Sequence, residues 1–226
     1  MVKESNGQLL AKLYPRLFHM SHAGSWPSIQ EHGLLSTTAL LDLFKVEGER
    51  RILLEECRRA QAEEITHPVH GRAMLRDQQP LNEKKLRTCL QDGLSPGDWY
   101  KLLNRKVFFW GPEARLKILQ GARLYEAHRQ TIVEIDTESF LQRYADRITL
   151  CYINSGSTQP MAWDRGKNTF LPLETFPLAE RRRKYGVKNA VAEVTVDYAV
   201  PDVWDFVVGA YEIGGPAPKA VLWPVA

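Results

Sequence analysis

Cysteine is scarce in this chain, and the cysteines present lie far apart. Among 226 residues there are three, Cys57, Cys89 and Cys151, with no CxxC pair. This number and spacing argue against a disulfide framework and against a thiolate zinc site. Long apolar runs are missing too, because no window approaches the roughly 18 consecutive apolar residues of a membrane-spanning helix. We therefore expect no membrane partner.

A strong charge of one sign is also absent. The net charge is +3, from 30 basic and 27 acidic residues, which favours an anionic partner such as nucleic acid only slightly. The densest basic run, residues 181–184, fits a solvated helix face as well as a phosphate-binding patch. The first 18 residues hold no continuous apolar segment, so no secretory signal is predicted. We expect a cytoplasmic protein with one domain over residues 1–226.

Short helices and strands are intermixed along the chain. A strand is predicted near residues 17–21, followed by a helix that Pro27 begins and Gly33 ends. Residues 40–65 have a helical pattern, and Ser95 with Asp98 marks another helix start. Further strands are predicted at 107–110, 131–135, 148–153, 191–196 and 204–208, and further helices near 113–122 and 137–144. The pattern predicts an α+β fold with curved, mixed or antiparallel sheets and flanking helices.

Histidines are the first candidate site residues. His19 and Ser21 lie two apart on the predicted strand, so they project to one face and can hydrogen-bond a ribose or a carboxamide. From periodicity alone, the simpler interpretation of His19 is a core histidine whose hydrogen bonds are made within the protein. His22 points to the opposite face, so it cannot share a metal with His19 without a bend. His67-x-x-His70 lacks companion ligands in the sequence, and no metal site is predicted.

Two charged residues are further candidates. Glu193 lies in an apolar strand, where a carboxylate is costly unless it is paired or faces a cleft. Glu134 is in a similar position, although facing solvent is its simpler interpretation. Arg76 can clamp a pyrophosphate through its planar fork of donors, although most such arginines are surface residues. Residues 154–160 combine small residues and hydroxyls, which suit close approach of a ligand or merely a turn.

Three blocks of the sequence, in this order, resemble DarT-type ADP-ribosyltransferases. They are LFHMSH with WPSIQEHGLLS at residues 17–36, VFFWGPE at 107–113, and AEVTV at 192–196 followed by Val200-Pro201-Asp202. The sequence departs from that pattern at Glu113, where the family has an arginine. The chain is even more similar to a bacterial family of unknown function that shares four blocks: RDQ at 76–78, LN-x-x-VFFW at 103–110, GST at 156–158 and RG-x-x-TF-x-PL at 165–173.

The resemblance implies an ADP-ribosyltransferase-like fold and an enzyme that cleaves the nicotinamide–ribose bond of NAD. NAD would be a substrate, and no metal would be needed. ADP-ribose would pass to an unidentified acceptor, with nucleic acid slightly favoured, in a toxin-like enzyme. Two other activities stay open: an RNA phosphotransferase that transfers to NAD, and a non-catalytic module of the same fold that binds NAD or another nucleotide.

The resemblance also implies roles for individual residues. His19, with Ser21 or His22, would hold the nicotinamide ribose, and Arg76 would bind the pyrophosphate or stabilise developing charge. Phe109 or Trp110 would stack on the nicotinamide. Glu193 would stabilise the ribose cation or deprotonate the acceptor. The implied catalytic residues are Glu193, Arg76 and His19.

Overall fold

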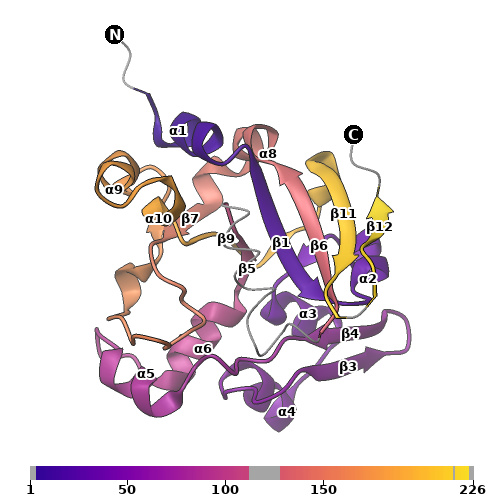
Figure 1. The fold of residues 1–226 in the computed structure, drawn as a ribbon. Helices are drawn as coiled ribbons and strands as arrows, with labels where there is room; N and C mark the ends of the chain where they lie inside the picture. The colour runs from indigo at the N-terminus through magenta and orange to yellow at the C-terminus, as the bar shows by residue number, and fades with distance from the viewer. Residues whose placement is uncertain (1–3, 112–127, 216, 224–226) are drawn as a thin grey trace.

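Two four-stranded antiparallel sheets carry the fold (Figure 1). The structure is a computed structural model that describes residues 4–111, 128–215 and 217–223. The first sheet has the order β1 (Arg16–His22), β6 (Gln130–Asp136), β11 (Val207–Ile213) and β12 (Ala220–Trp223). The second has the order β5 (Lys106–Phe109), β9 (Glu193–Asp197), β7 (Ile148–Cys151) and β8 (Leu171–Pro172). Two-stranded pairs join β2 (Leu34–Leu35) to β10 (Ala199–Val200), and β3 (Glu63–His67) to β4 (Gly71–Leu75).

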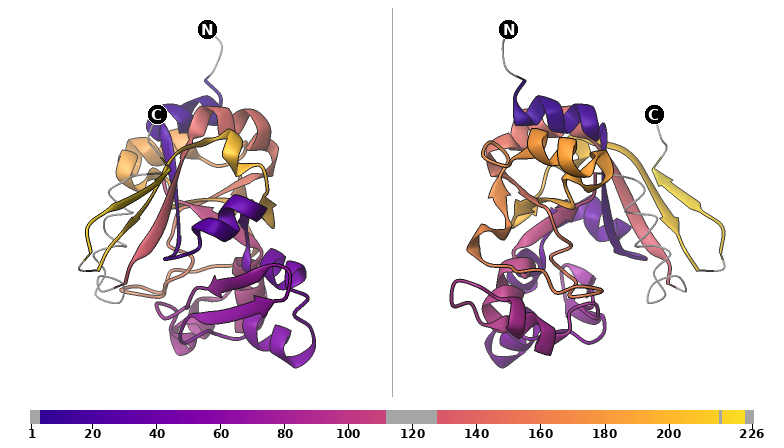
Figure 2. Two further views of the ribbon diagram at one scale, coloured as in Figure 1. Left: turned by 90° about the vertical axis from the view of Figure 1, so that its right-hand side faces the viewer. Right: turned by 60° about the vertical axis from the view of Figure 1, so that its left-hand side comes forward.

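Helices gather at the two ends of the sheets (Figures 1 and 2). At one end lie α1 (Asn6–Leu13), α8 (Thr137–Tyr144), α9 (Leu178–Tyr185) and α10 (Val187–Ala190). At the other lie α3 (Thr37–Leu43), α4 (Gly48–Glu55), α5 (Glu83–Cys89), α6 (Pro96–Asn104) and the β3–β4 hairpin. α2 (Trp26–His32) follows β1, and three 3₁₀ turns complete the described elements: η1 (Ala145–Arg147), η2 (Lys167–Thr169) and η3 (Val203–Asp205). The predicted α+β class with antiparallel sheets and flanking helices is confirmed.

The edge strands β1 and β5 join the two sheets. Phe18 and Trp110 exchange two backbone hydrogen bonds of 2.9 Å each, which link the first sheet to the end of β5. The largest apolar core lies between the two sheets and the helices α1, α8, α9 and α10. It contains Leu17, Phe109 and Val194, which come from three different strands. Because successive strand residues point to opposite faces, the neighbours of these core residues face the other way.

Local signals predicted several elements well. α2 begins with Pro27 in its first turn and ends at Gly33, which has a φ of 72°. A Cβ on Gly33 would also lie 2.5 Å from the carbonyl oxygen of Pro201, so only glycine fits. α6 has the expected capping box between Ser95 and Asp98. The predicted helix at 137–144 is α8, and the one near 113–122 lies outside the described residues.

The prediction of one helix over residues 40–65 was wrong. The backbone turns left-handed at Lys45 (φ 52°) and Gly48 (φ 61°), which separates α3 from α4. Ile65 lies in β3, and its side chain packs in the same apolar cluster as Leu41 and Leu54. Apolar residues of two helices and a hairpin thus produced a pattern typical of one helix. The strand predicted at 204–208 was displaced, because η3 occupies its start and β11 begins at Val207.

No helix in the described part of the chain is both long enough and apolar enough to cross a lipid bilayer.

Candidate functional site

A cavity of about 660 Å³ lies where the two sheets meet. Its walls come from β1, β5, β9, α2, the β3–β4 hairpin and the segments that follow the hairpin and β7. This volume is within the range of small-molecule sites in proteins. The cavity therefore gathers side chains from parts of the chain that are far apart in sequence.

His19 is half-buried at the seam between the sheets and lines the cavity. Its Nδ1 lies 2.9 Å from the carbonyl oxygen of Phe108, and because a carbonyl only accepts, Nδ1 carries the proton. Burial lowers the pKa of His19 to about 4, the positive charge of Arg76 acts in the same direction, and the Phe108 hydrogen bond opposes both. His19 is therefore neutral at pH 7, and its Nε2 can accept a hydrogen bond from a ligand hydroxyl.

Glu193 is the first residue of β9, lines the cavity and is only 3% exposed. Its Oε1 accepts a hydrogen bond of 3.1 Å from the backbone N–H of Ser155. The neighbouring Cys151 thiol is buried, and burial together with the nearby Glu193 carboxylate raises its pKa well above the usual value. The thiol is consequently protonated and unreactive, so the carboxyl group of Glu193 is the chemically useful group at this position.

The loop that binds Glu193 is held by a buried arginine. Arg165 is 1% exposed, and its guanidinium donates hydrogen bonds of 3.0 Å to the carbonyl oxygens of Ser155, Ser157 and Trp163. The next residue in the chain is Gly166. Only glycine fits at this position, because a Cβ there would lie 2.3 Å from Oδ2 of Asp92. The RG-x-x-TF block thus fixes the 154–157 loop, and the loop in turn fixes Glu193.

Arg76 enters the cavity from the segment after β4. Its Nη1 donates a hydrogen bond of 3.3 Å to the carbonyl oxygen of Met20 on β1. Arg59, buried beneath it, donates from Nε to the Arg76 carbonyl oxygen at 2.9 Å and from Nη2 to Asn104 Oδ1 at 3.0 Å. Gln78 completes the brace, since its backbone N–H donates to Arg59 O at 2.8 Å and its side chain accepts from Arg59 N at 3.0 Å. All three residues of the RDQ block line the cavity, and Gln78 also braces Arg59.

The structure brings six of the seven predicted site residues to this cavity: His19, Ser21, His22, Arg76, Trp110 and Glu193. The seventh, Phe109, was predicted wrongly. It is 0% exposed, packs in the apolar core, and contacts His19 from behind with ring centroids 5.9 Å apart. Phe109 and Trp110 are neighbours on an extended segment, so only one of them can face the cavity, and Phe108 shares the face of Trp110.

Glu134 does not line the cavity, in agreement with the simpler prediction that it faces solvent. It is on β6, is partly exposed and lies 3.6 Å from Arg16 Nε through its Oε1. Residues that the sequence reasoning did not assign include Arg59, Asn104 and Arg165, although the LN and RG blocks contain two of them. Their roles depend on contacts between distant segments, which no local pattern encodes.

Comparison with known proteins gives a family assignment. A family model described as "Family of unknown function (DUF7002)" matches residues 15–207. The chain belongs to the DUF7002 family. No match was found among curated proteins. The DUF7002 match begins just before β1 and ends at the start of β11, so it includes every residue that lines the cavity.

This DUF7002 cavity combines an acceptor nitrogen, a carboxyl group, an arginine and an aromatic wall. Those are His19, Glu193, Arg76, and Phe108 with Trp110. A neutral imidazole and a carboxylate bind hydroxyl groups, an arginine binds phosphate oxygens, and aromatic rings stack on planar heterocycles. The arrangement is suited to a nucleotide-like ligand that carries all three features.

Proposed function

We propose that this protein is an NAD-dependent mono-ADP-ribosyltransferase that acts at the cavity between the sheets. The observation that carries the proposal is the meeting of His19 and Glu193 in one cavity, although they come from different sheets and lie far apart in sequence. The resemblance of the β1 and β9 blocks to DarT-type enzymes supports the same pairing. An ADP-ribosyltransferase-like fold is part of this proposal.

The chemistry requires few groups. The bond between the nicotinamide nitrogen and C1′ of the ribose breaks, and nicotinamide leaves with the electron pair. The carboxylate of Glu193 stabilises the ribose cation or accepts the acceptor's proton as the new bond to C1′ forms. His19 Nε2 accepts from a ribose hydroxyl, Arg76 binds the pyrophosphate, and Trp110 or Phe108 contacts the nicotinamide. Ser21 and His22, which also line the cavity, extend the polar surface beside His19.

The alternative of an RNA phosphotransferase calls for several basic side chains directed at phosphates. Four line the cavity: Arg59, Arg72, Arg76 and Lys106. Arg59 is buried and donates hydrogen bonds to protein acceptors. Lys106 forms an ion pair with Asp197, and Nη1 of Arg72 lies 3.8 Å from Oε2 of Glu64. Arg76 also contacts the protein, through the Met20 carbonyl oxygen. Because all four basic side chains contact protein groups, the cavity does not favour binding of an RNA backbone at several phosphates.

The first test measures nicotinamide release from NAD by the wild-type chain, by Glu193→Gln and by Glu134→Gln. Glu193→Gln keeps an oxygen that can accept from Ser155 but loses the negative charge, so we expect release to fall at least about 100-fold. Glu134→Gln changes the same residue type on a strand outside the cavity, and we expect wild-type release. Thermal melting of each variant checks that the fold is intact.

The acceptor is tested separately, with DNA and RNA oligonucleotides and a protein extract as substrates for labelled NAD. NAD that binds the wild-type protein but is never consumed with any acceptor would identify a non-catalytic module. Absence of NAD binding, or equal release by wild type and Glu193→Gln, would overturn the proposal.

A further inference from the structure

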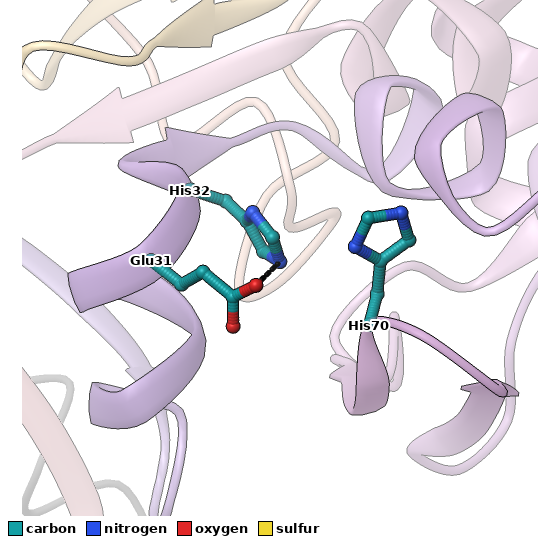
Figure 3. A group of neighbouring side chains, drawn as sticks. All are labelled: Glu31, His32 and His70. Atoms are coloured by element: carbon teal, nitrogen blue, oxygen red, sulfur yellow. Dashed lines mark ion pairs between the residues drawn. The ribbon is translucent and has the colours of Figure 1, made fainter.

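A second group of side chains lies outside the cavity, between the end of α2 and the turn of the β3–β4 hairpin. It consists of Glu31, His32 and His70, one potential ligand atom of each lying within 4.8 Å of the other two (Figure 3). Glu31 and His32 are the last residues of α2, and His70 is in the turn. From the sequence alone no metal site was predicted, because His70 has only His67 near it and His32 lies in a distant segment.

Two nitrogens of this group are buried without a hydrogen-bond partner among the described residues. His32 Nε2 and His70 Nδ1 have no hydrogen bond within the part of the chain that the structure describes. The nearest Glu31 oxygen is 3.6 Å from His32 Nε2, which is too long for a hydrogen bond. A buried nitrogen with no hydrogen bond destabilises the fold, so two such nitrogens in one group call for a ligand.

Neighbouring groups hold His70 in place. Its ring stacks on His67 with centroids 4.8 Å apart and meets the His32 ring edge-on at 5.1 Å. His67 Nδ1 accepts from the backbone N–H groups of Val69 and His70, at 3.2 and 3.4 Å, so that nitrogen is already engaged in shaping the turn. His67 therefore supports the group and does not belong to the ligand set.

We propose that Glu31, His32 and His70 bind a divalent transition-metal ion of the Zn²⁺ type. Two imidazole nitrogens and a carboxylate oxygen are donors that zinc accepts, with a fourth position left to solvent. Atoms no more than 4.8 Å apart lie within about 2.8 Å of a common point, and zinc bonds are roughly 2.0–2.1 Å long. An inward shift of each side chain by under about 1 Å closes the site, and Glu31 is exposed enough to move.

The ion would tie the hairpin turn to α2. The hairpin supplies Arg72 to the cavity wall and leads directly into Arg76, while α2 supplies Pro27 and Ile29. The metal would thus stabilise the cavity wall that is not held by the central sheets, and it would take no part in group transfer. This inference is independent of the proposed NAD chemistry.

The test is Zn²⁺ titration of the full chain after chelator treatment, by calorimetry and metal analysis, with Co²⁺ absorption as the spectroscopic readout. We expect one Zn²⁺ per chain, at least tenfold weaker binding in His32→Ala and in His70→Ala, and loss of the tetrahedral Co²⁺ bands in both. His128→Ala removes an exposed histidine outside the group and should bind as wild type.

Glu31→Gln is the second variant, since an exposed glutamine leaves folding unaffected while weakening a carboxylate ligand. Thermal melting supplies an independent readout: Zn²⁺ should raise the Tm of wild type and His128→Ala but not of His70→Ala. Absence of Zn²⁺ binding by wild type, or binding that persists unchanged in both His32→Ala and His70→Ala, would overturn the proposal.

Discussion

Two walls of the cavity are held in different ways. The wall around Glu193 is fixed by internal hydrogen bonds, because β9 lies inside a four-stranded sheet and Arg165 ties down the neighbouring loop. The wall formed by the β3–β4 hairpin is only two strands wide, and its turn carries His70, whose buried Nδ1 has no hydrogen bond to any residue that the structure describes. The Glu193 wall is held by hydrogen bonds between segments of the chain, whereas the hairpin wall adjoins two histidine nitrogens that can bind a ligand.

The largest expected effect is on the Glu193 wall. Arg165→Leu removes the guanidinium donor from three carbonyl groups, of which Ser155 keeps only a longer bond of 3.4 Å from Trp99 Nε1. Two of the three lost bonds are buried, so we expect a loss of about 3–5 kcal/mol in the free energy of unfolding. Urea unfolding measures it. The control is Arg87→Leu, because Arg87 is exposed and pairs only with Glu83 on the same helix among the described contacts, so its loss should stay under about 1 kcal/mol. Similar losses in both variants would show that Arg165 is not a brace.

A smaller effect is expected from the seam histidine. His19 has a pKa of about 4 in the folded chain, against about 6.5 when unfolded. Between these values only the unfolded chain takes up the proton, so the stability contributed by neutral His19 is present above pH 6.5 and is lost as pH falls towards 4. We expect wild type to lose about 1–2 kcal/mol more than His19→Gln between pH 7 and pH 5, measured by urea unfolding. Parallel pH profiles for the two proteins would contradict the buried, neutral histidine.

The smallest effect concerns the hairpin itself. Hydrogen exchange should be fast at the amides of Glu63–His67 and Gly71–Leu75, and slow in β9, because a two-stranded ribbon opens at lower free energy than a central strand. Zn²⁺ should slow exchange in the hairpin several-fold and leave β9 unchanged. His70→Ala should abolish that response. Equally slow exchange of the hairpin amides and the β9 amides in the absence of metal would contradict the proposed difference between the two walls.

Much of the candidate site could be predicted from local patterns. The two-residue spacing of His19 and Ser21 placed both on the cavity side of β1, and Glu193 stood out as a carboxylate in an apolar strand. The assignment of Phe109 to the cavity was wrong. The same alternation requires Phe109 and Trp110 to face opposite ways, and the sequence did not show which of the two faced the core. The helix predicted over residues 40–65 was wrong because apolar spacing does not reveal left-handed residues such as Lys45.

The sequence by itself determined the short-range features of this protein: the Pro27 start and Gly33 end of α2, the Ser95 capping box, and which side chains share a strand face. These depend on backbone geometry over a few residues. Only the tertiary structure decided that Arg165 would hold the loop beside Glu193, and that His32 would meet His70. Those contacts join segments whose approach is set by sheet pairing and core packing, which act between residues far apart in the chain.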